Sequence, residues 1–283
     1  MSLLRVAGAA ALFALAVSVT AQPKSREDCE RTYKPQIGQT GKDVIWVPTP
    51  DDLVTRMLTM AHTTPRDYVV DLGAGDGKIA IAAAKEFGAR ALGIEYNPDM
   101  VRLAQCMTEV EGVASKAKII QGDVFKEDFS QATVVTMYLL PELNLRLRPI
   151  ILNMRPGTRV VSHQFTMGDW EPDQSATIEH RSAYLWIVPA KVEGTWNFHN
   201  RGGSTQFTVS LSQKYQRISG DAFLGAHKQP IVGASLHGDE IRFAFNDDKE
   251  VTQTLTGRVH GGDITGTLKA AGDGEVPITG KRK

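Results

Sequence analysis

The sequence predicts an α/β fold with a doubly wound parallel sheet, followed by a small antiparallel β-domain that forms a sandwich or a barrel. Two observations predict it. From residue 68 to residue 165, short segments that are apolar on both faces are separated by helical stretches, which is typical of a parallel sheet covered on both sides. Beyond residue 190 the segments become short and alternating, and this last third of the chain holds 14 of its 26 glycines.

The start of the chain has the pattern of a secretory signal. One arginine precedes an uncharged run from Val6 to Gln22, and the small residues before Gln22 predict cleavage after Ala21. A membrane anchor is the alternative, although spanning a bilayer takes about 20 predominantly apolar residues and small and polar residues dilute this run. We therefore expect an exported, periplasmic or envelope-associated protein, with an N-terminal membrane anchor as the second option.

Residues 22–43 are polar and show neither a helical nor a strand period, so we expect a linker or a surface arm. A helix is expected next, because Pro50 suits its first turn, Asp51 and Asp52 complement its dipole, and apolar residues then recur at helical spacing.

The elements that follow alternate as far as residue 165. The expected strands cover residues 68–73, 90–96, 117–123, 132–140 and 158–165, and the expected helices cover 78–88, 98–112 and 143–154. In the β-domain the expected strands cover 194–199, 205–212, 215–220, 230–238, 240–246, 254–261 and 263–269, with Trp196, Phe198, Phe207 and Val209 facing inward. The predicted boundaries are 1–21 for the signal, 22–43 for the linker, 44–189 for the α/β domain and 190–283 for the β-domain.

Charge and cysteine content exclude several classes of site. Lys plus Arg and Asp plus Glu both number 32, so the formal net charge is zero and no basic footprint for nucleic acid is present. The two cysteines, Cys29 and Cys106, show no metal-ligand spacing and no disulfide framework, and Cys106 is expected to be a buried thiol in a helix. The histidines are scattered without metal-ligand spacing, so no metal site is expected.

A glycine-rich turn follows the first strand of the α/β domain. Asp71 ends this strand, and Gly73, Gly75 and Gly77 stand two residues apart, where missing side chains let backbone amides approach a ligand and leave the next helix N-terminus accessible. Glu95 ends the next strand, where its carboxylate can accept hydrogen bonds from both hydroxyls of a ribose.

Two features separate this site from a dinucleotide site. The glycines follow G-x-G-x-G and not the G-x-G-x-x-G of NAD-binding folds. The third strand ends in "QGDVF", where Asp123 can accept a hydrogen bond from the exocyclic amine of adenine beside the backbone amide of Val124.

These residues resemble the class I S-adenosylmethionine-dependent methyltransferases, a Rossmann-like fold, over residues 44–183. "VVDLGAGDG", "GIEYNP" and "GDVF" are similar to their first, ribose and adenine motifs. "WVPTP", "IEYNPDMV" and "YLLPELN" are similar to the protein-lysine methyltransferases that include the enzymes of the adenine nucleotide translocase and the ATP synthase c subunit. The resemblance implies S-adenosyl-L-methionine as cofactor and a protein lysine as acceptor. It also implies that the methionine end is covered by Trp46, Pro48, Thr49 and Pro50, with Asp71 and Gly73 below it. The expected cofactor-binding residues are Trp46, Pro48, Thr49, Asp71, Gly73, Gly75, Gly77, Glu95, Asn97, Asp123 and Val124.

The candidate catalytic residues follow the fourth strand, in "TMYLLPELN". Tyr138 can wall the methyl channel, and Glu142 can orient an amine, although core packing and a solvated helix start are the respective alternatives. The segment is not Asn-Pro-Pro-Tyr or Asp-Pro-Pro-Tyr, which argues against adenine and glutamine amides as acceptors. His163 can act as a base at the end of the fifth strand, but such a histidine is more often structural.

Two other functions stay open at this point. An NAD-dependent oxidoreductase is disfavoured by the glycine spacing, and a non-catalytic envelope binding module would use the β-domain instead. An export signal also conflicts with a cofactor that is made in the cytosol. The protein acts while anchored or before export, works in the envelope on cofactor of unknown origin, or keeps the fold without catalysis.

Overall fold

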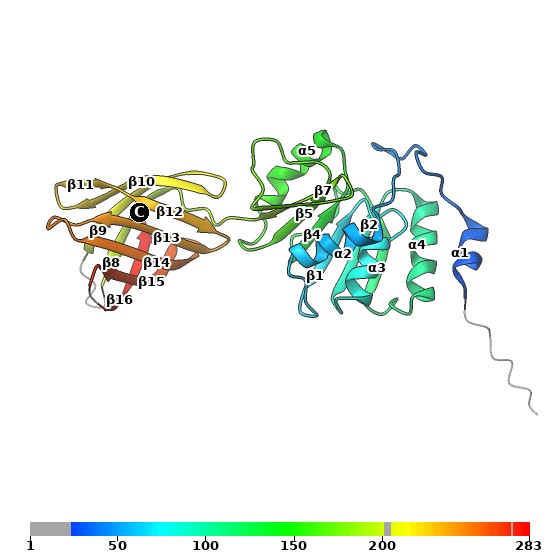
Figure 1. The fold of residues 1–283 in the computed structure, drawn as a ribbon, viewed down its shortest axis with the longest axis horizontal. Helices are drawn as coiled ribbons and strands as arrows, with labels where there is room; N and C mark the ends of the chain where they lie inside the picture. Colours follow the sequence, from blue (N-terminus) through cyan, green and yellow to red (C-terminus); the bar gives the residue numbers. More distant parts are fainter. Residues whose placement is uncertain (1–23, 201–204, 273) are drawn as a thin grey trace, which may run out of the picture.

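A computed structural model describes residues 24–200, 205–272 and 274–283. The signal predicted for residues 1–21 and the alternative anchor over residues 6–22 lie outside these ranges. Figure 1 shows two bodies side by side: a mixed sheet with its helices, and a rolled antiparallel sheet formed by the C-terminal part of the chain. No helix among the described residues is long and apolar enough to cross a membrane.

The first body is a seven-stranded sheet in the order β3-β2-β1-β4-β5-β7-β6. Strands β1 to β5 run parallel, whereas β7 and β6 continue the sheet antiparallel. The strands are β1 (Tyr68–Leu72), β2 (Arg90–Glu95), β3 (Ala117–Gln121), β4 (Val134–Met137), β5 (Arg159–His163), β6 (Gln174–Ile178) and β7 (Arg181–Ile187), and the helices are α1 (Arg26–Thr32), α2 (Asp51–Met60), α3 (Lys78–Lys85), α4 (Pro98–Val110) and α5 (Pro141–Ile151).

Two apolar clusters cover the two faces of this sheet. Helices α2, α3 and α4 pack on one face, and α5 packs on the other with Trp170 and Trp186. The doubly wound α/β prediction is confirmed, but the sheet is mixed rather than wholly parallel. The connection between β3 and β4 contains no helix, so the expectation that helical stretches separate all the strands is wrong there. A helix needs a recurring apolar stripe, and the polar stretch 122–131 offers too little of one.

The N-terminal segment corrects two expectations. Ser25 caps α1 in a capping box with Asp28, so part of the predicted linker is a helix. A disulfide joins Cys29 on α1 to Cys106 on α4, and the prediction of a thiol at Cys106 is wrong. The two cysteines are 77 residues apart, and they meet because α1 packs against α4, which their spacing in the sequence does not reveal.

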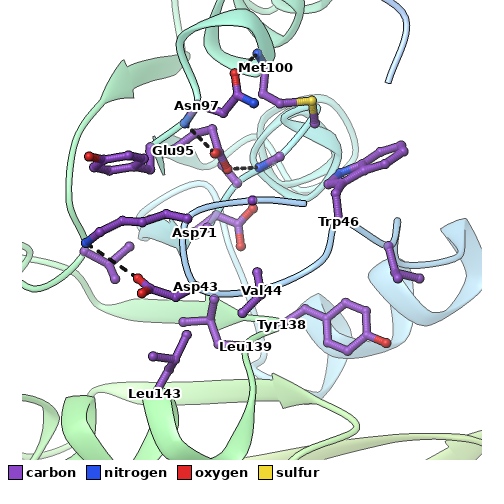
Figure 2. A pocket seen from close by; sticks show the side chains of 18 of the residues that line it. Asp43, Val44, Trp46, Asp71, Glu95, Asn97, Met100, Tyr138, Leu139 and Leu143 are labelled. Carbon is purple, nitrogen blue, oxygen red and sulfur yellow. Dashed lines mark hydrogen bonds and ion pairs between the residues drawn. The ribbon is translucent and has the colours of Figure 1, made fainter. Parts of the chain in front are cut away.

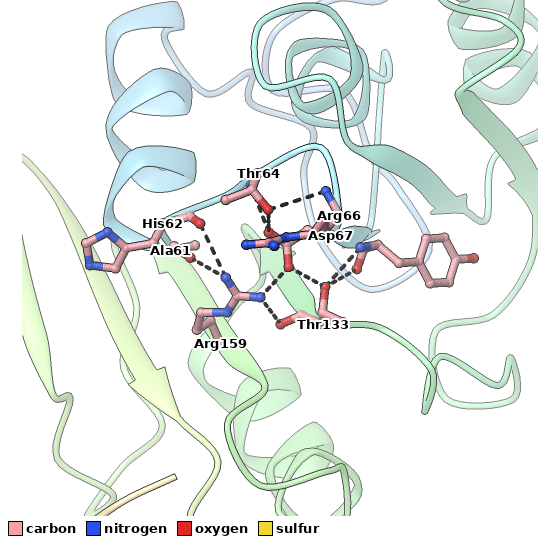
Figure 3. Close-up of polar contacts among 8 residues, drawn as sticks. Ala61, His62, Thr64, Arg66, Asp67, Thr133 and Arg159 are labelled. Carbon is pink, nitrogen blue, oxygen red and sulfur yellow. Dashed lines mark hydrogen bonds and ion pairs between the residues drawn. The ribbon is translucent and has the colours of Figure 1, made fainter.

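A polar cluster fixes the edge of the sheet at which β1, β4 and β5 begin (Figure 3). Asp67 accepts hydrogen bonds from the backbone N–H of Thr64 (2.8 Å) and the hydroxyl of Thr133 (2.8 Å), and it forms an ion pair with Arg159. Arg159 also donates to the carbonyl of Ala61 at the end of α2 (2.9 Å). The cluster therefore holds α2 and three strands together at the edge opposite the strand ends that carry the glycine turn.

The second body is a nine-stranded antiparallel sheet that rolls into a near-barrel, in the order β11-β10-β9-β8-β16-β15-β14-β13-β12. Strands β10 and β12, near opposite ends of this order, approach one another, and the Ile231 N–H donates to the carbonyl of Gly220 at 3.0 Å. The strands are β8 (Gly194–His199), β9 (Thr205–Lys214), β10 (Arg217–Leu224), β11 (His227–Pro230), β12 (Val232–His237), β13 (Glu240–Asn246), β14 (Thr252–His260), β15 (Asp263–Ala270) and β16 (Glu275–Arg282).

Aromatic residues fill the near-barrel. The predicted inward residues Trp196, Phe198, Phe207 and Val209 are all buried. Phe198 and Phe207 stack with ring centroids 4.8 Å apart. The antiparallel β-domain is thus confirmed, and of the two predicted architectures it approaches the barrel. The residue numbers of the domain boundaries stay predictions.

The hairpin turn between β9 and β10 docks the near-barrel on the first body. Tyr215 stacks on Trp170 with centroids 5.8 Å apart, and its hydroxyl donates to Asp169 at 2.9 Å. Arg148 of α5 donates to the same carboxylate at 2.7 Å. The turn therefore contacts both α5 and the loop that follows β5.

Candidate functional site

A cavity opens at the carboxyl ends of β1, β2, β3 and β4, and residues 39–49 form a strap across it. The strap is a hairpin, in which the Trp46 N–H donates to the carbonyl of Gln39 at 2.9 Å and the Gly41 N–H donates to that of Val44 at 2.8 Å. Figure 2 shows Glu95, Asn97 and Met100 on one side of the cavity and Tyr138, Leu139 and Leu143 on the other, with Asp71 between them.

The glycine turn supplies the floor of the cavity. Gly73, Gly75 and Gly77 have φ values of 78°, 56° and 81°, in the left-handed region that favours glycine. A Cβ at Gly75 would lie 2.7 Å from Nε1 of Trp46, so the indole packs directly on this backbone. Gly77 does not line the cavity: it caps α3, and a Cβ there would lie 3.0 Å from the Cβ of Ala104 on α4. Its contribution is to the turn and to helix packing.

Glu95 holds the glycine turn from the neighbouring strand. Its carboxylate accepts from the N–H of Gly75 and from the N–H of Asn97, both at 2.8 Å. The Asn97 side chain in turn caps α4 by accepting from the N–H of Asp99 at 2.8 Å. Each carboxylate oxygen of Glu95 keeps a further lone pair, so both can accept hydrogen bonds from two adjacent hydroxyl groups.

Asp123 and Val124 line the cavity beyond β3, as the sequence predicts. Asp123 accepts from the N–H of Phe125 at 3.0 Å and from Nζ of Lys42 at 2.9 Å. The hydrogen bond from Lys42 is the main reason that the pKa of Asp123 lies below its usual range. Lys42 therefore connects the strap to the part of the cavity beyond β3, a contact that the sequence did not indicate.

Asp71 is a buried carboxyl group at the centre of the cavity. It is 2% exposed and accepts from the hydroxyl of Thr136 at 2.8 Å. The pKa of Asp71 is raised to about 7, mainly by burial and to a smaller extent by the nearby carboxylates of Asp76 and Glu95, against the hydrogen bond from Thr136, which lowers it. A cationic ligand beside Asp71 would favour its ionised form.

Tyr138 lines the cavity after β4, between two other rings. Its centroid lies 3.8 Å from that of His163 and 6.1 Å from that of Phe165. Glu142, the other predicted catalytic residue, does not line the cavity, because the helical phase that buries Leu143 and Leu147 turns it to solvent on α5.

The part of the chain that carries this cavity matches known proteins. Residues 71–174 match the ANTKMT methyltransferase domain. A protein-lysine N-methyltransferase of Saccharolobus islandicus is 42% identical over 151 residues, which are 51% of this chain and 94% of that protein. The adenine nucleotide translocase lysine N-methyltransferase of Mus musculus is 30% identical over 178 residues, which are 61% of this chain and 72% of that protein. The chain belongs to the ANTKMT methyltransferase family.

As a member of the ANTKMT family, the chain is a class I S-adenosylmethionine-dependent methyltransferase. A solved RNA methyltransferase of Salinibacter ruber, in complex with S-adenosyl-L-homocysteine, is 48% identical with a TM-score of 0.51, covering 52% of this chain and 96% of that one. The human lysine N-methyltransferase named for the ATP synthase c subunit is 37% identical over 38% of this chain and 46% of its own length. The chain thus matches about half of that relative, and the family domain includes no residue of the near-barrel.

The cavity of this ANTKMT-family chain fits S-adenosylmethionine. Side chains at Gly73 and Gly75 would fill the floor, and Glu95 offers two oxygens to a ribose. The buried carboxyl group of Asp71 suits a ligand that carries an ammonium and a sulfonium. The predicted cofactor residues that line the cavity are Trp46, Pro48, Thr49, Asp71, Gly73, Gly75, Glu95, Asn97, Asp123 and Val124.

Several lining residues were not predicted from the sequence. Lys42 and Asp43 come from the predicted linker, Met100 from the first turn of α4 and Phe165 from the loop after β5. The stretches "NPDMV" and "SHQF" contain Met100 and Phe165, but their positions as cavity walls depend on how those segments pack.

Proposed function

We propose that this methyltransferase N-methylates a lysine side chain of a protein. Relatives from Saccharolobus islandicus, Homo sapiens and Mus musculus are all named lysine N-methyltransferases. The end of the cavity at Tyr138 supports the same acceptor. This end of the cavity has a wall of aromatic and aliphatic side chains, which suits the alkyl chain of lysine. The wall consists of Tyr138, Leu139, Leu140, Leu143 and Phe165.

The cofactor, when bound, would supply a methyl group attached to sulfur. As the bond between the methyl carbon and the acceptor nitrogen forms, the bond between carbon and sulfur breaks, and its electron pair stays on sulfur. The protein positions the reactants and excludes water. Glu95 and the glycine turn hold the nucleoside end of the cofactor, and the Trp46 indole covers the floor of the cavity. The buried carboxyl group of Asp71 suits the cationic part of the cofactor. The amine reacts after losing a proton to water or to a nearby base, because only its neutral form has a lone pair.

A binding experiment tests the cofactor part of this proposal. Calorimetric titration of S-adenosylmethionine into the purified protein should show one saturable site, and NAD should show none. Glu95→Ala should lower the affinity at least about tenfold, because it removes the acceptor for the Gly75 and Asn97 N–H groups and for the ribose. Glu142→Ala is the matched control, since this carboxylate is exposed outside the cavity. Equal affinities in both variants would contradict the site.

A labelling experiment tests the acceptor. Protein and RNA extracts are incubated with the enzyme and S-adenosylmethionine that carries a labelled methyl group, and hydrolysed protein is analysed for methylated lysine. We expect label in methyl-lysine. The Salinibacter relative is named an RNA methyltransferase, so label that nuclease removes would assign the enzyme to RNA instead.

We also propose that the protein is exported and folds in an oxidising compartment. The N-terminal pattern of a cleaved signal supports export, and the disulfide between Cys29 and Cys106 supports an oxidising environment, because disulfides are rare in the cytosol. The mature protein from the envelope fraction should begin at Gln22 and contain no reactive thiol. Cytosolic protein that keeps Met1 and two thiols would refute this proposal.

A further inference from the structure

Thr49 in the wall of the cavity forms a hydrogen-bonded pair with His163, which lies behind this wall. Thr49 is the last strap residue that lines the cavity, and its Oγ1 lies 3.0 Å from Nδ1 of His163 at the end of β5. His163 is 2% exposed and packs against Tyr138, with ring centroids 3.8 Å apart and the ring planes tilted by 31°. The pair thus connects the strap to the ring that walls the acceptor end.

The surroundings of this pair favour a neutral imidazole. Burial, and to a smaller extent the positive charge of Arg181 on β7, lower the pKa of His163 to about 4. A neutral imidazole has one ring nitrogen that donates and one that accepts. If Nδ1 is the accepting nitrogen, the Thr49 hydroxyl must donate its proton to it.

A hydroxyl group that donates in one direction presents its oxygen as an acceptor in the others. The Thr49 oxygen then offers lone pairs at a cavity wall that also contains Tyr138 and Phe165. In these largely apolar surroundings, a ligand N–H group is the complementary partner for such an oxygen.

We propose that His163 is a positioning residue that orients the Thr49 hydroxyl, and that Thr49 Oγ1 accepts a hydrogen bond from the acceptor amine. This proposal rests on the proposed amine methylation, and it assigns Thr49 to the acceptor nitrogen instead of the methionine end of the cofactor, where the sequence resemblance placed it. Nδ1 of His163 accepts a hydrogen bond from the Thr49 hydroxyl, and Nε2 carries the proton of the ring. It orients the amine through Thr49 without exchanging a proton with it.

The test compares two ligands that differ at the position of the methyl group. Sinefungin carries an amine there, whereas S-adenosylhomocysteine carries nothing, so the ratio of their dissociation constants reports recognition of an amine at the acceptor end. Both constants are measured by calorimetry for the wild type and for Thr49→Val, which keeps the shape of the side chain and removes the hydroxyl. We expect the preference for sinefungin to fall about tenfold in Thr49→Val with the affinity for S-adenosylhomocysteine unchanged.

The other variants separate orientation from packing. Thr49→Ser should keep the preference because it keeps the hydroxyl. His163→Phe keeps a ring against Tyr138 but offers no acceptor, and should reduce the preference as Thr49→Val does, with no further loss in the double variant. His163→Asn, which places an amide oxygen near the position of Nδ1, should restore part of it. Thr59→Val on the exposed side of α2 is the control for the loss of a hydroxyl.

The outcomes distinguish this inference from the proposed function. Additive losses in the double variant, or an unchanged preference in Thr49→Val, would overturn the inference even if the wild type forms methyl-lysine. Loss of S-adenosylhomocysteine affinity in Thr49→Val would place Thr49 on the cofactor instead, and would overturn it as well. A wild type that forms no methyl-lysine in the labelling experiment would overturn the proposed function itself. Nitrogen NMR of His163 should show a protonated Nε2, and a protonated Nδ1 would refute the assigned orientation.

Discussion

Asp71 and Glu95 end neighbouring strands, yet their surroundings give the two carboxyl groups different properties. Glu95 accepts from two backbone N–H groups at 2.8 Å and remains half-buried. Asp71 is buried, with a pKa raised to about 7. Asp71 is therefore a group in this cavity whose charge changes near neutral pH.

The titration of Asp71 predicts how cofactor affinity depends on pH. Below about pH 7 the carboxyl group of the free protein is protonated, and a cationic ligand must displace that proton to gain an ionised partner. Affinity for S-adenosylmethionine should therefore rise with pH between about pH 5.5 and 7, by up to about tenfold per pH unit. Calorimetry across this range measures the slope.

The control for this prediction is Asp71→Asn, which should bind weakly with a flat dependence on pH. A slope that persists in Asp71→Asn would show that another group titrates.

Site residues at strand ends were the predictable ones. In a parallel sheet, a residue that ends a strand lies at the edge that binds ligands, which located Asp71, Glu95 and Asp123. Lys42 and Phe165 enter the cavity from irregular segments, whose paths depend on packing that no local pattern encodes. Glu142 is exposed at the start of α5, which matches the alternative of a solvated helix start, since Leu143 and Leu147 fix the phase that turns it outward.

At the scale of elements, the strap depends on contacts at both of its ends. On one side it continues into α2, and on the other it follows α1, which the disulfide fixes to α4. Between them, Lys42 contacts Asp123 and Trp46 packs on the glycine turn. The position of the strap over the cofactor site is thus linked to the state of two cysteines.

Removal of the disulfide should lower stability and cofactor affinity together. In the double variant Cys29→Ser and Cys106→Ser, the free energy of unfolding should be about 2–5 kcal/mol lower than in the wild type, because the disulfide closes a loop with a sequence separation of 77. Guanidinium titrations measure this change, and calorimetry should show weaker binding of S-adenosylmethionine because α1 no longer fixes the strap. Dithiothreitol should reproduce both effects in the wild type and change nothing in the double variant; a wild type that is insensitive to it would contradict the link.

Most elements with a strong apolar pattern were predictable, and those without one were not. Strands β1, β2 and β5 are buried runs that the sequence marks clearly. Strand β6 alternates between exposed and half-buried residues at the edge of the sheet, so it lacks the apolar face from which a strand is predicted. Helix α1 has seven residues, too few to display a helical period, and its capping box was its sole local signal.

At the scale of the whole molecule, the near-barrel contacts the first body at α5 and at the loop after β5. The same helix begins directly after Leu139 and Leu140 of the cavity wall, and the same loop carries Phe165. Because the hairpin turn docks on Trp170 and Asp169, it restrains α5 and the loop after β5, and through them the acceptor end of the site.

Tyr215→Ala should weaken this docking. It removes the ring that stacks on Trp170 and the hydroxyl that donates to Asp169, at a cost of about 1–2 kcal/mol. The melting temperature should fall while S-adenosylmethionine affinity stays the same, because the nucleoside end lies on other strands. Arg217→Ala, at the start of β10, should change little, since its ion pair with Glu171 is exposed to solvent. A larger effect from Arg217 than from Tyr215 would refute the assignment.

The disulfide also gives the chain a closed topology. Residues 29 to 106 form a covalent ring that includes the strap, the glycine turn and Glu95, whereas Asp123 and Tyr138 lie outside it. A protease that cuts the exposed backbone near Lys42 would open the ring without separating the two pieces. The nicked enzyme would remain one molecule until it is reduced, so a cut in the strap would not detach it from the rest of the site.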